Sequence, residues 1–232
     1  MKTYIIVGII LVALVALLAT NKKLVETLKN IYKIEELRQR ILFTLGLLLI
    51  YRLGSFVTLP GVDHSILEQW TQNFANDSSS LMGLLNIFSG GAFSQASIFA
   101  LGVMPYITAS IVIQLLGMVL PSFQKMQREG ESGRNKINRI TRYLTVAILL
   151  FQGPSYLVNL KVQMLHAGSV MPEGLWFSIS STLILCAGSM FVMWLGERMT
   201  DRGIGNGISM LIMIGIIARF PAAIMQEFIS RT

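Results

Sequence analysis

A glycine-rich run at residues 203–207, GIGNG, is the strongest candidate in the sequence for a phosphate-binding loop. Such loops bring backbone N–H groups close to a nucleotide phosphate. This run lacks the last glycine of the G-x-G-x-x-G pattern, because position 208 is isoleucine, and it has no P-loop lysine. A long apolar segment precedes it instead of a strand. The run therefore predicts a flexible turn into a helix, with small residues that allow close helix packing.

Other residues that could do chemistry stand alone. Ser209 lacks the G-x-S-x-G setting of a hydrolase nucleophile, and the apolar segments contain no His or Asp that could activate it. His64 and His166 lack metal-ligand spacing. Cys186 is the only cysteine and cannot form an intrachain disulfide. We therefore expect no catalytic residues, no cofactor and no metal, and the chain is not predicted to be an enzyme.

The composition argues against an ordinary soluble domain. Charged residues make up 13% of the 232 residues and hydrophobic residues 53%, whereas soluble proteins contain about 25% charged residues. The net charge of +7 can indicate a nucleic-acid-binding protein, but here basic blocks flank long apolar runs. The pattern predicts an all-α, polytopic membrane helical bundle, with anionic lipid headgroups as the nearest partners of the basic blocks.

Five apolar segments approach the length of about 20 residues that a membrane-spanning helix needs. Arg52 lies near the far end of the first, where its long side chain can reach the interface. Trp176 and Trp194 lie near the two ends of the fourth, as interfacial aromatic residues do. The predicted spans are residues 41–59, 95–120, 143–160, 175–195 and 207–226.

Basic residues predict the orientation of these spans, because positive charge marks the cytoplasmic side. Of the 19 Lys and Arg residues, six lie in residues 21–40 and six in residues 124–142. The segments predicted to be cytoplasmic are residues 21–40, 121–142 and 196–206, and those predicted to be external are residues 60–94 and 161–174.

The external segment 60–94 contains a short apolar stretch that ends at Gly90 and Gly91. The stretch is too short to cross a bilayer, so we expect a short helix buried against neighbouring helices or inside a cavity. The next span contains Pro105, which removes a backbone donor and predicts a broken helix. A short re-entrant helix before a broken span is typical of channels and transporters.

Charged side chains are missing from the predicted spans, apart from Arg52 and Arg219 near their outer ends. A proton- or ion-coupled transporter is expected to carry Asp, Glu, Lys or His at mid-membrane. The residues alone therefore favour a passive conduit or a structural membrane subunit. Half of a small-solute transporter is the alternative.

Four motifs occur in order along the predicted spans. They are YRLGSF with LPGVD (residues 51–56 and 59–63), SGGAFSQASIFALGVMPYITASIVIQLL (89–116), EGESGR (129–134), and MWLGE with TDRGIGNGIS (193–197 and 200–209). In this order and topology they resemble the N-terminal half of the SecY family, the central subunit of the bacterial protein-translocation channel. The resemblance covers about residues 21–232.

The resemblance implies an hourglass-shaped channel for unfolded secretory chains, with a lateral gate through which signal sequences and membrane segments enter lipid. By motif position it implies a ring of apolar residues at the waist, formed by Val103 and Ile107 of the second span and Ile208 and Ile212 of the fifth. An apolar ring resists ion leak by dewetting. It also implies a plug helix at about residues 81–92, including Leu81, Leu84, Leu85, Ile87, Phe88, Gly90 and Gly91.

Two polar features fit the family but have simpler explanations. Gln114 is expected either at the lateral gate or in a helix–helix hydrogen bond. The basic loop 124–142 is expected either to contact the ribosome and the SecA motor or to be basic only because it lies on the cytoplasmic side of the membrane. The resemblance also implies SecE and SecG as channel subunits, nascent secretory and membrane proteins as substrates, and a location in the bacterial cytoplasmic (inner) membrane.

Two features depart from the family. SecY proteins have ten spans in two inverted halves, and five spans cannot close the pore. We therefore expect this chain to act with a C-terminal half, or else to be a truncated or split subunit without autonomous transport. Residues 1–20 match no SecY motif. Three interpretations are open: a signal-peptide core, an extra span, or a fused or misassembled segment from a neighbouring reading frame. We favour the third.

Residues 21–40 separate this atypical leader from the first predicted span. Apolar residues recur there every three or four positions between Lys and Glu, which predicts an amphipathic helix on the cytoplasmic membrane surface. A solubilising linker is the alternative. The apolar positions are Leu24, Leu28, Ile31, Ile34 and Leu37.

Overall fold

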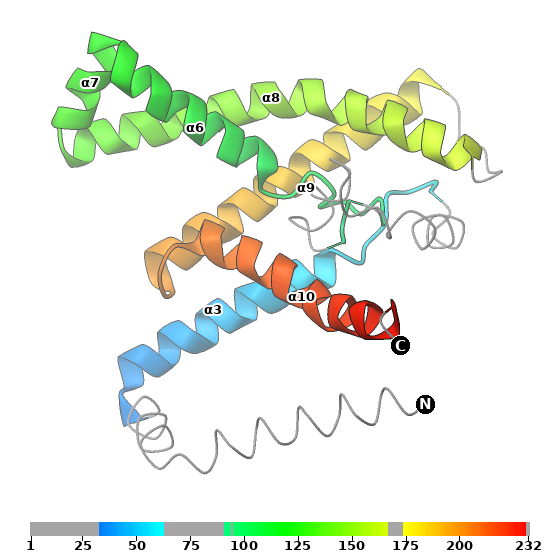
Figure 1. The fold of residues 1–232 in the computed structure, drawn as a ribbon. Coiled ribbons are helices and arrows are strands. Elements are labelled where there is room, and N and C mark those ends of the chain that lie inside the picture. The colour runs from blue at the N-terminus through cyan, green and yellow to red at the C-terminus, as the bar shows by residue number, and fades with distance from the viewer. Residues whose placement is uncertain (1–32, 63–90, 94, 167–173, 231–232) are drawn as a thin grey trace.

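The computed structural model describes residues 33–62, 91–93, 95–166 and 174–230. Its secondary structure is helical, apart from one isolated bridge between Thr58 and Ser97. The all-α prediction is therefore confirmed for the described part of the chain (Figure 1). The helices are α3 (Glu35–Gly54), α6 (Met104–Val119), α7 (Pro121–Arg128), α8 (Glu131–His166), α9 (Leu175–Arg202) and α10 (Gly207–Ser230).

Several predictions fall outside the described residues. These are the leader at residues 1–20, most of the amphipathic segment 21–40, and the greater part of the external segment. The predicted plug is among them, except for Gly91 and Ala92. The plug residues outside the described ranges are Leu81, Leu84, Leu85, Ile87, Phe88 and Gly90.

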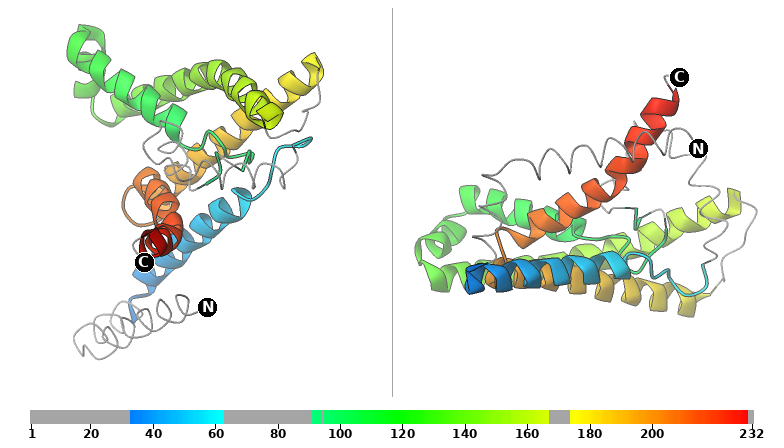
Figure 2. Two further views of the ribbon diagram at one scale, coloured as in Figure 1. Left: turned by 45° about the vertical axis from the view of Figure 1, so that its right-hand side comes forward. Right: turned by 90° about the horizontal axis from the view of Figure 1, so that it is seen from below.

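The helices form an elongated bundle in which the chain runs back and forth between two ends. One end holds the start of α3, α7, the start of α8, and the junction between α9 and α10, at the left of Figure 1. Figure 2 shows the same arrangement from two other sides. We call this the basic end, because it carries the basic residues of the 124–142 segment. The orientation that the sequence predicts requires these same segments to share one side of the membrane.

Helix α9 is the central element, because it contacts α3, α8 and α10. Its buried positions recur every three or four residues, as expected for a helix that packs along one broad face. Two of them, Gly188 and Gly196, lie where other parts of the chain approach the helix too closely for a side chain. The buried residues of α9 are Ser181, Thr182, Leu185, Gly188, Ser189, Val192, Met193, Leu195, Gly196 and Met199.

The helix bounds differ from the predicted spans at both cytoplasmic connections. Residues 121–142 were expected to form a loop, but they form α7 and the first turns of α8, which is 36 residues long. The α6–α7 pair bends by 101° at Leu120–Pro121, since the residue before a proline is pushed out of the helical region. Helix α9 continues to Arg202, so the turn before α10 is shorter than predicted.

The predicted second span is also different. Residues 95–103 are a series of turns, and the helix begins only at Met104. Ala96 and Gly102 have φ angles of 47° and 52°, in the left-handed region that ends regular helix. Pro105 was expected to break a helix in its middle. It lies instead in the first turn of α6, where its missing N–H costs no hydrogen bond.

Two of the described helices, α8 and α9, are long and apolar enough to cross a membrane, and the bent α6–α7 pair makes a third if it counts as one span. Helix α10 contributes a shorter apolar stretch, Gly207–Ala218. The chain is a membrane protein built as a helical bundle, and the count of five spans stays a prediction.

Candidate pore constriction

The predicted ring residues of the second span lie where turns give way to helix. Val103 precedes α6 directly and is 7% exposed. The backbone N–H of Ile107 donates to the carbonyl of Val103, 3.1 Å away, in the first hydrogen bond of the helix. The two side chains therefore stand one turn apart on the same face of the helix start.

The predicted ring residues of the fifth span lie at the start of α10. Asn206 caps this helix: its Oδ1 accepts a hydrogen bond from the N–H of Ser209 at 3.2 Å, and its carbonyl accepts one from Met210 at 3.0 Å. Ile208 and Ile212 follow at helical spacing. The cap fixes where α10 begins and therefore where Ile208 lies.

Two glycines bring the start of α10 against the end of α9. A Cβ added at Gly207 would collide with the carbonyl oxygen of Gly196. A Cβ at Gly196 would lie 2.6 Å from Cδ1 of Ile208. The backbone contact at Gly207 leaves no room for a side chain at that position. The GIGNG run, which the sequence predicts to be a turn, thus positions a ring residue.

Three of the four predicted ring residues belong to one apolar cluster. Val103 is buried within it, and Ile107 and Ile208 pack against it. Ile212 is half-buried and is not among the described residues that pack there. The buried members of the cluster come from α3, α9, α10 and the turns before α6, and they are Leu47, Leu48, Tyr51, Phe99, Val103, Val192, Leu195, Met199 and Leu211.

Threonines hold the turn between α9 and α10. The hydroxyl of Thr44 in α3 donates to the carbonyl of Arg40 at 2.8 Å and accepts from the N–H of Ile204 at 3.2 Å. Thr200 accepts from the N–H of Gly207 at 2.9 Å. These bonds satisfy backbone donors that a helix junction leaves open. The turn is therefore fixed to both α9 and α3.

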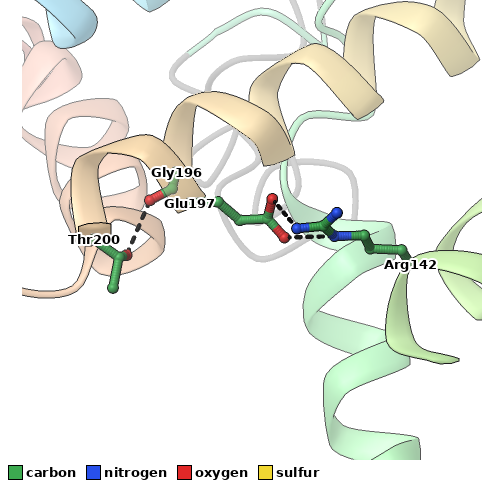
Figure 3. A network of polar contacts seen from close by, with 4 residues as sticks. All are labelled: Arg142, Gly196, Glu197 and Thr200. Carbon is green, nitrogen blue, oxygen red and sulfur yellow. Dashed lines mark hydrogen bonds and ion pairs between the residues drawn. The ribbon is translucent and has the colours of Figure 1, made fainter. Parts of the chain in front are cut away.

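An ion pair that the sequence did not predict joins α8 to α9 at the basic end. The guanidinium of Arg142 donates to both carboxylate oxygens of Glu197, at 3.0 and 2.8 Å, and Figure 3 shows the two groups facing one another. Two parallel bonds of this kind fix geometry as well as distance. The residues are separated by 55 positions, so no local pattern could reveal the pair.

Comparison with known proteins decides the family. The sequence profile of the SecY family matches residues 97–232. The chain belongs to the SecY family. It is 45% identical over 199 residues to protein translocase subunit SecY of Streptomyces scabiei, which covers 83% of this chain and 45% of that protein.

Two further relatives carry the same name. The Buchnera aphidicola (subsp. Schizaphis graminum) protein is 47% identical over 208 residues, covering 88% of this chain and 46% of the relative. The Escherichia coli K12 protein is 46% identical over 189 residues, covering 82% of this chain and 42% of the relative. The chain therefore spans about half the length of the curated relatives it matches.

The remaining site predictions for a SecY family member lie on α6 and just before it. Gln114 is exposed, and its Nε2 donates to the hydroxyl of Ser110 in the same helix at 3.3 Å. This bond lies within α6 and does not cross to another helix. Gly91, which lies in the predicted plug together with Ala92, is buried with φ 94°. A role for either residue in gating stays a prediction.

Proposed function

We propose that this chain supplies the N-terminal half of the pore and lateral gate of a protein-conducting channel. Through it, unfolded secretory proteins cross the bacterial cytoplasmic membrane, and membrane proteins enter the bilayer. One observation carries the proposal: Val103 and Ile107 at the start of α6 and Ile208 at the start of α10 lie in or against a single apolar cluster. Relatives named as protein translocase subunits support it.

The chemistry of this cluster suits a constriction. Its members are apolar except for the phenol hydroxyls of Tyr51 and Tyr106. A narrow apolar passage excludes water and hence ions. It also contacts any passing side chain without preference, as a channel for many different unfolded chains requires. A coupled solute transporter would instead place a charged group there.

The outer face of α6 suits a lateral gate. Ile111, Val112, Leu115, Met118 and Val119 are all exposed apolar residues, and α6 contacts α7 and α8 within the chain. The exposed face is therefore open to lipid or to further helices, and Gln114 lies on the same part of α6.

The partners follow from the proposed role. We assign this face of α6 to the gate, which the C-terminal half completes, with Gln114 at its edge. SecE and SecG complete the channel, and SecA and the ribosome act at the basic end. None of these roles requires an enzyme activity from this chain.

A photo-crosslinking amino acid at Ile107 tests the proposal. A secretory precursor is stalled in native membrane vesicles that contain this chain and its companion subunits. We expect the Ile107 probe to label the precursor. The same probe at Phe151, which is 80% exposed on α8, is the control and should label lipid only. Labelling of lipid alone from Ile107, with a precursor demonstrably stalled, would overturn the proposed function.

A further inference from the structure

The turns before α6 are the longest non-helical backbone within the described part of the bundle. We call residues 91–93 and 95–103 the pre-α6 segment. Most of it is buried: Ala92, Ala96, Ser97 and Ala100 are at most 2% exposed. Non-helical backbone inside a membrane protein is tolerated only where the protein itself satisfies its polar groups. The partners of this segment therefore decide whether it is fixed in place.

Backbone pairing fixes one side of the segment. The N–H of Leu59 donates to the carbonyl of Ala96 at 2.9 Å, and the N–H of Ile98 donates to the carbonyl of Val57 at 2.9 Å. These two bonds form the isolated antiparallel bridge between Thr58 and Ser97. The bridge ties the segment to the chain that leaves α3.

Helix α8 fixes a second side. The phenol of Tyr156, which is 6% exposed, donates to the carbonyl oxygen of Phe93 at 2.8 Å. The two rings also meet edge to face, with centroids 5.0 Å apart. Buried tyrosines generally use their hydroxyl in this way, because the apolar ring packs while the polar tip needs a partner. Here that partner is backbone of the pre-α6 segment.

Helix α9 fixes a third side. A Cβ at Gly188 would collide with the carbonyl oxygen of Ile98, so the helix backbone and the segment touch directly. Phe99 stacks between Tyr51 of α3 and Phe191 of α9, with ring centroids 6.1 and 5.9 Å away. The segment is thus held from α3, α8 and α9, and it leads directly into Val103.

We propose that the pre-α6 segment is a fixed base for the constriction and that Tyr156 is a positioning residue of the pore, acting through the carbonyl of Phe93. The inference rests on the proposed function. Val103 stands at the end of this segment, so its place in the apolar cluster depends on how firmly the segment is held. Loss of the Tyr156 hydroxyl loosens one of three attachments, and the constriction residue shifts.

The first experiment measures the attachment itself. Tyr156→Phe removes one oxygen and leaves the ring contact with Phe93. Amide hydrogen exchange is followed in the purified complex that contains this chain. We expect roughly fivefold faster exchange in peptides covering residues 55–62 and 95–103, as loss of one hydrogen bond implies, and unchanged exchange in the centre of α9. Tyr143→Phe, which removes a hydroxyl from a residue of α8 that is 70% exposed, is the matched control and should change neither.

The second experiment measures the pore. Potassium permeability of resting membrane vesicles should rise several-fold for Tyr156→Phe and stay at the wild-type level for Tyr143→Phe. The yield of translocated precursor per chain should stay unchanged. A role in folding alone would instead lower the amount of chain and the translocation yield together, with no rise in permeability per chain.

The outcomes separate this inference from the proposed function. Unchanged exchange at residues 55–62 and 95–103 would overturn the attachment, and faster exchange without higher permeability would overturn the positioning role. In both cases translocation by the wild type would leave the proposed function standing. Wild-type vesicles that translocate no precursor would overturn the proposed function, and the inference with it.

Discussion

Different chemistry holds two regions of this molecule. At the basic end, α8 and α9 are joined by the Arg142–Glu197 ion pair, whose side chains are 51% and 24% exposed. Around the pre-α6 segment, the attachments are buried hydrogen bonds and ring contacts. Exposed ion pairs contribute about 0–1 kcal/mol, whereas leaving one buried polar group unpaired costs about 1–3 kcal/mol. The attachments of the pre-α6 segment are therefore stronger than this ion pair.

The two regions differ in the function that their contacts suit. The Arg142–Glu197 contact can break at little cost, which suits a surface that meets soluble partners. The backbone hydrogen bonds of the pre-α6 segment cannot, because they would be broken in an apolar environment. That rigidity suits the support of a constriction. Substitutions in each region should separate the two tasks.

The largest expected effect is that of Leu59→Ala. Leu59 is 1% exposed in the apolar cluster beneath the pre-α6 segment, and truncation of such a residue costs about 2–5 kcal/mol. Leu53→Ala is the control, because Leu53 is 62% exposed on the neighbouring turn of α3 and should cost much less. The free energy of unfolding of both variants is measured with denaturant in detergent micelles. Equal losses would show that the cluster does not hold the region.

A smaller loss is expected from Gly188→Ala. The new methyl group meets the carbonyl of Ile98, and such overpacking costs about 1–3 kcal/mol. Gly46→Ala in α3 is the matched control, since a Cβ there meets nothing within 4 Å. Alanine is also the better helix former, so the control should be neutral or stabilising. The free energy of unfolding of both variants is measured in the same way. Equal stability of Gly188→Ala and Gly46→Ala would contradict the close contact between α9 and the pre-α6 segment.

The smallest effect is expected at the basic end. In a double-mutant cycle of Arg142→Gln and Glu197→Gln, the coupling free energy should be below about 1 kcal/mol, because both groups are partly exposed. It should fall further as salt is raised, since ions screen exposed charges. A coupling above 2 kcal/mol, on the order of a buried pair, would remove the contrast between the two regions.

Local patterns in the sequence predicted the elements that depend on local chemistry. Apolar runs predicted the helices, Pro105 predicted a discontinuity in the second span, and the glycine-rich residues 203–207 predicted a turn. Each signal depends on a residue's own backbone or on neighbours within a few positions. The discontinuity was nevertheless misplaced, because Pro105 is as compatible with a helix start as with a kink.

Contacts between distant residues could not be predicted in this way. The pre-α6 segment is contacted by Val57, Tyr156 and Gly188, none of which is close to it in sequence. The pairing of Arg142 with Glu197 is of the same kind. Of the ring, Val103, Ile107 and Ile208 were named only through the family motif. Their apolar side chains resemble many others in the spans, and the structure places them in one cluster with Ile212 outside it.

The central claim is that Ile107 faces a closed, dry constriction while the outer face of α6 does not. The most direct test compares Ile107→Asn with Val112→Asn in resting membrane vesicles, because Val112 lies on another side of α6 and is 37% exposed. A polar side chain wets an apolar constriction, so potassium permeability should rise several-fold for Ile107→Asn and stay at the wild-type level for Val112→Asn. Equal permeability of the two variants, with both inserted in equal amounts, would contradict the account.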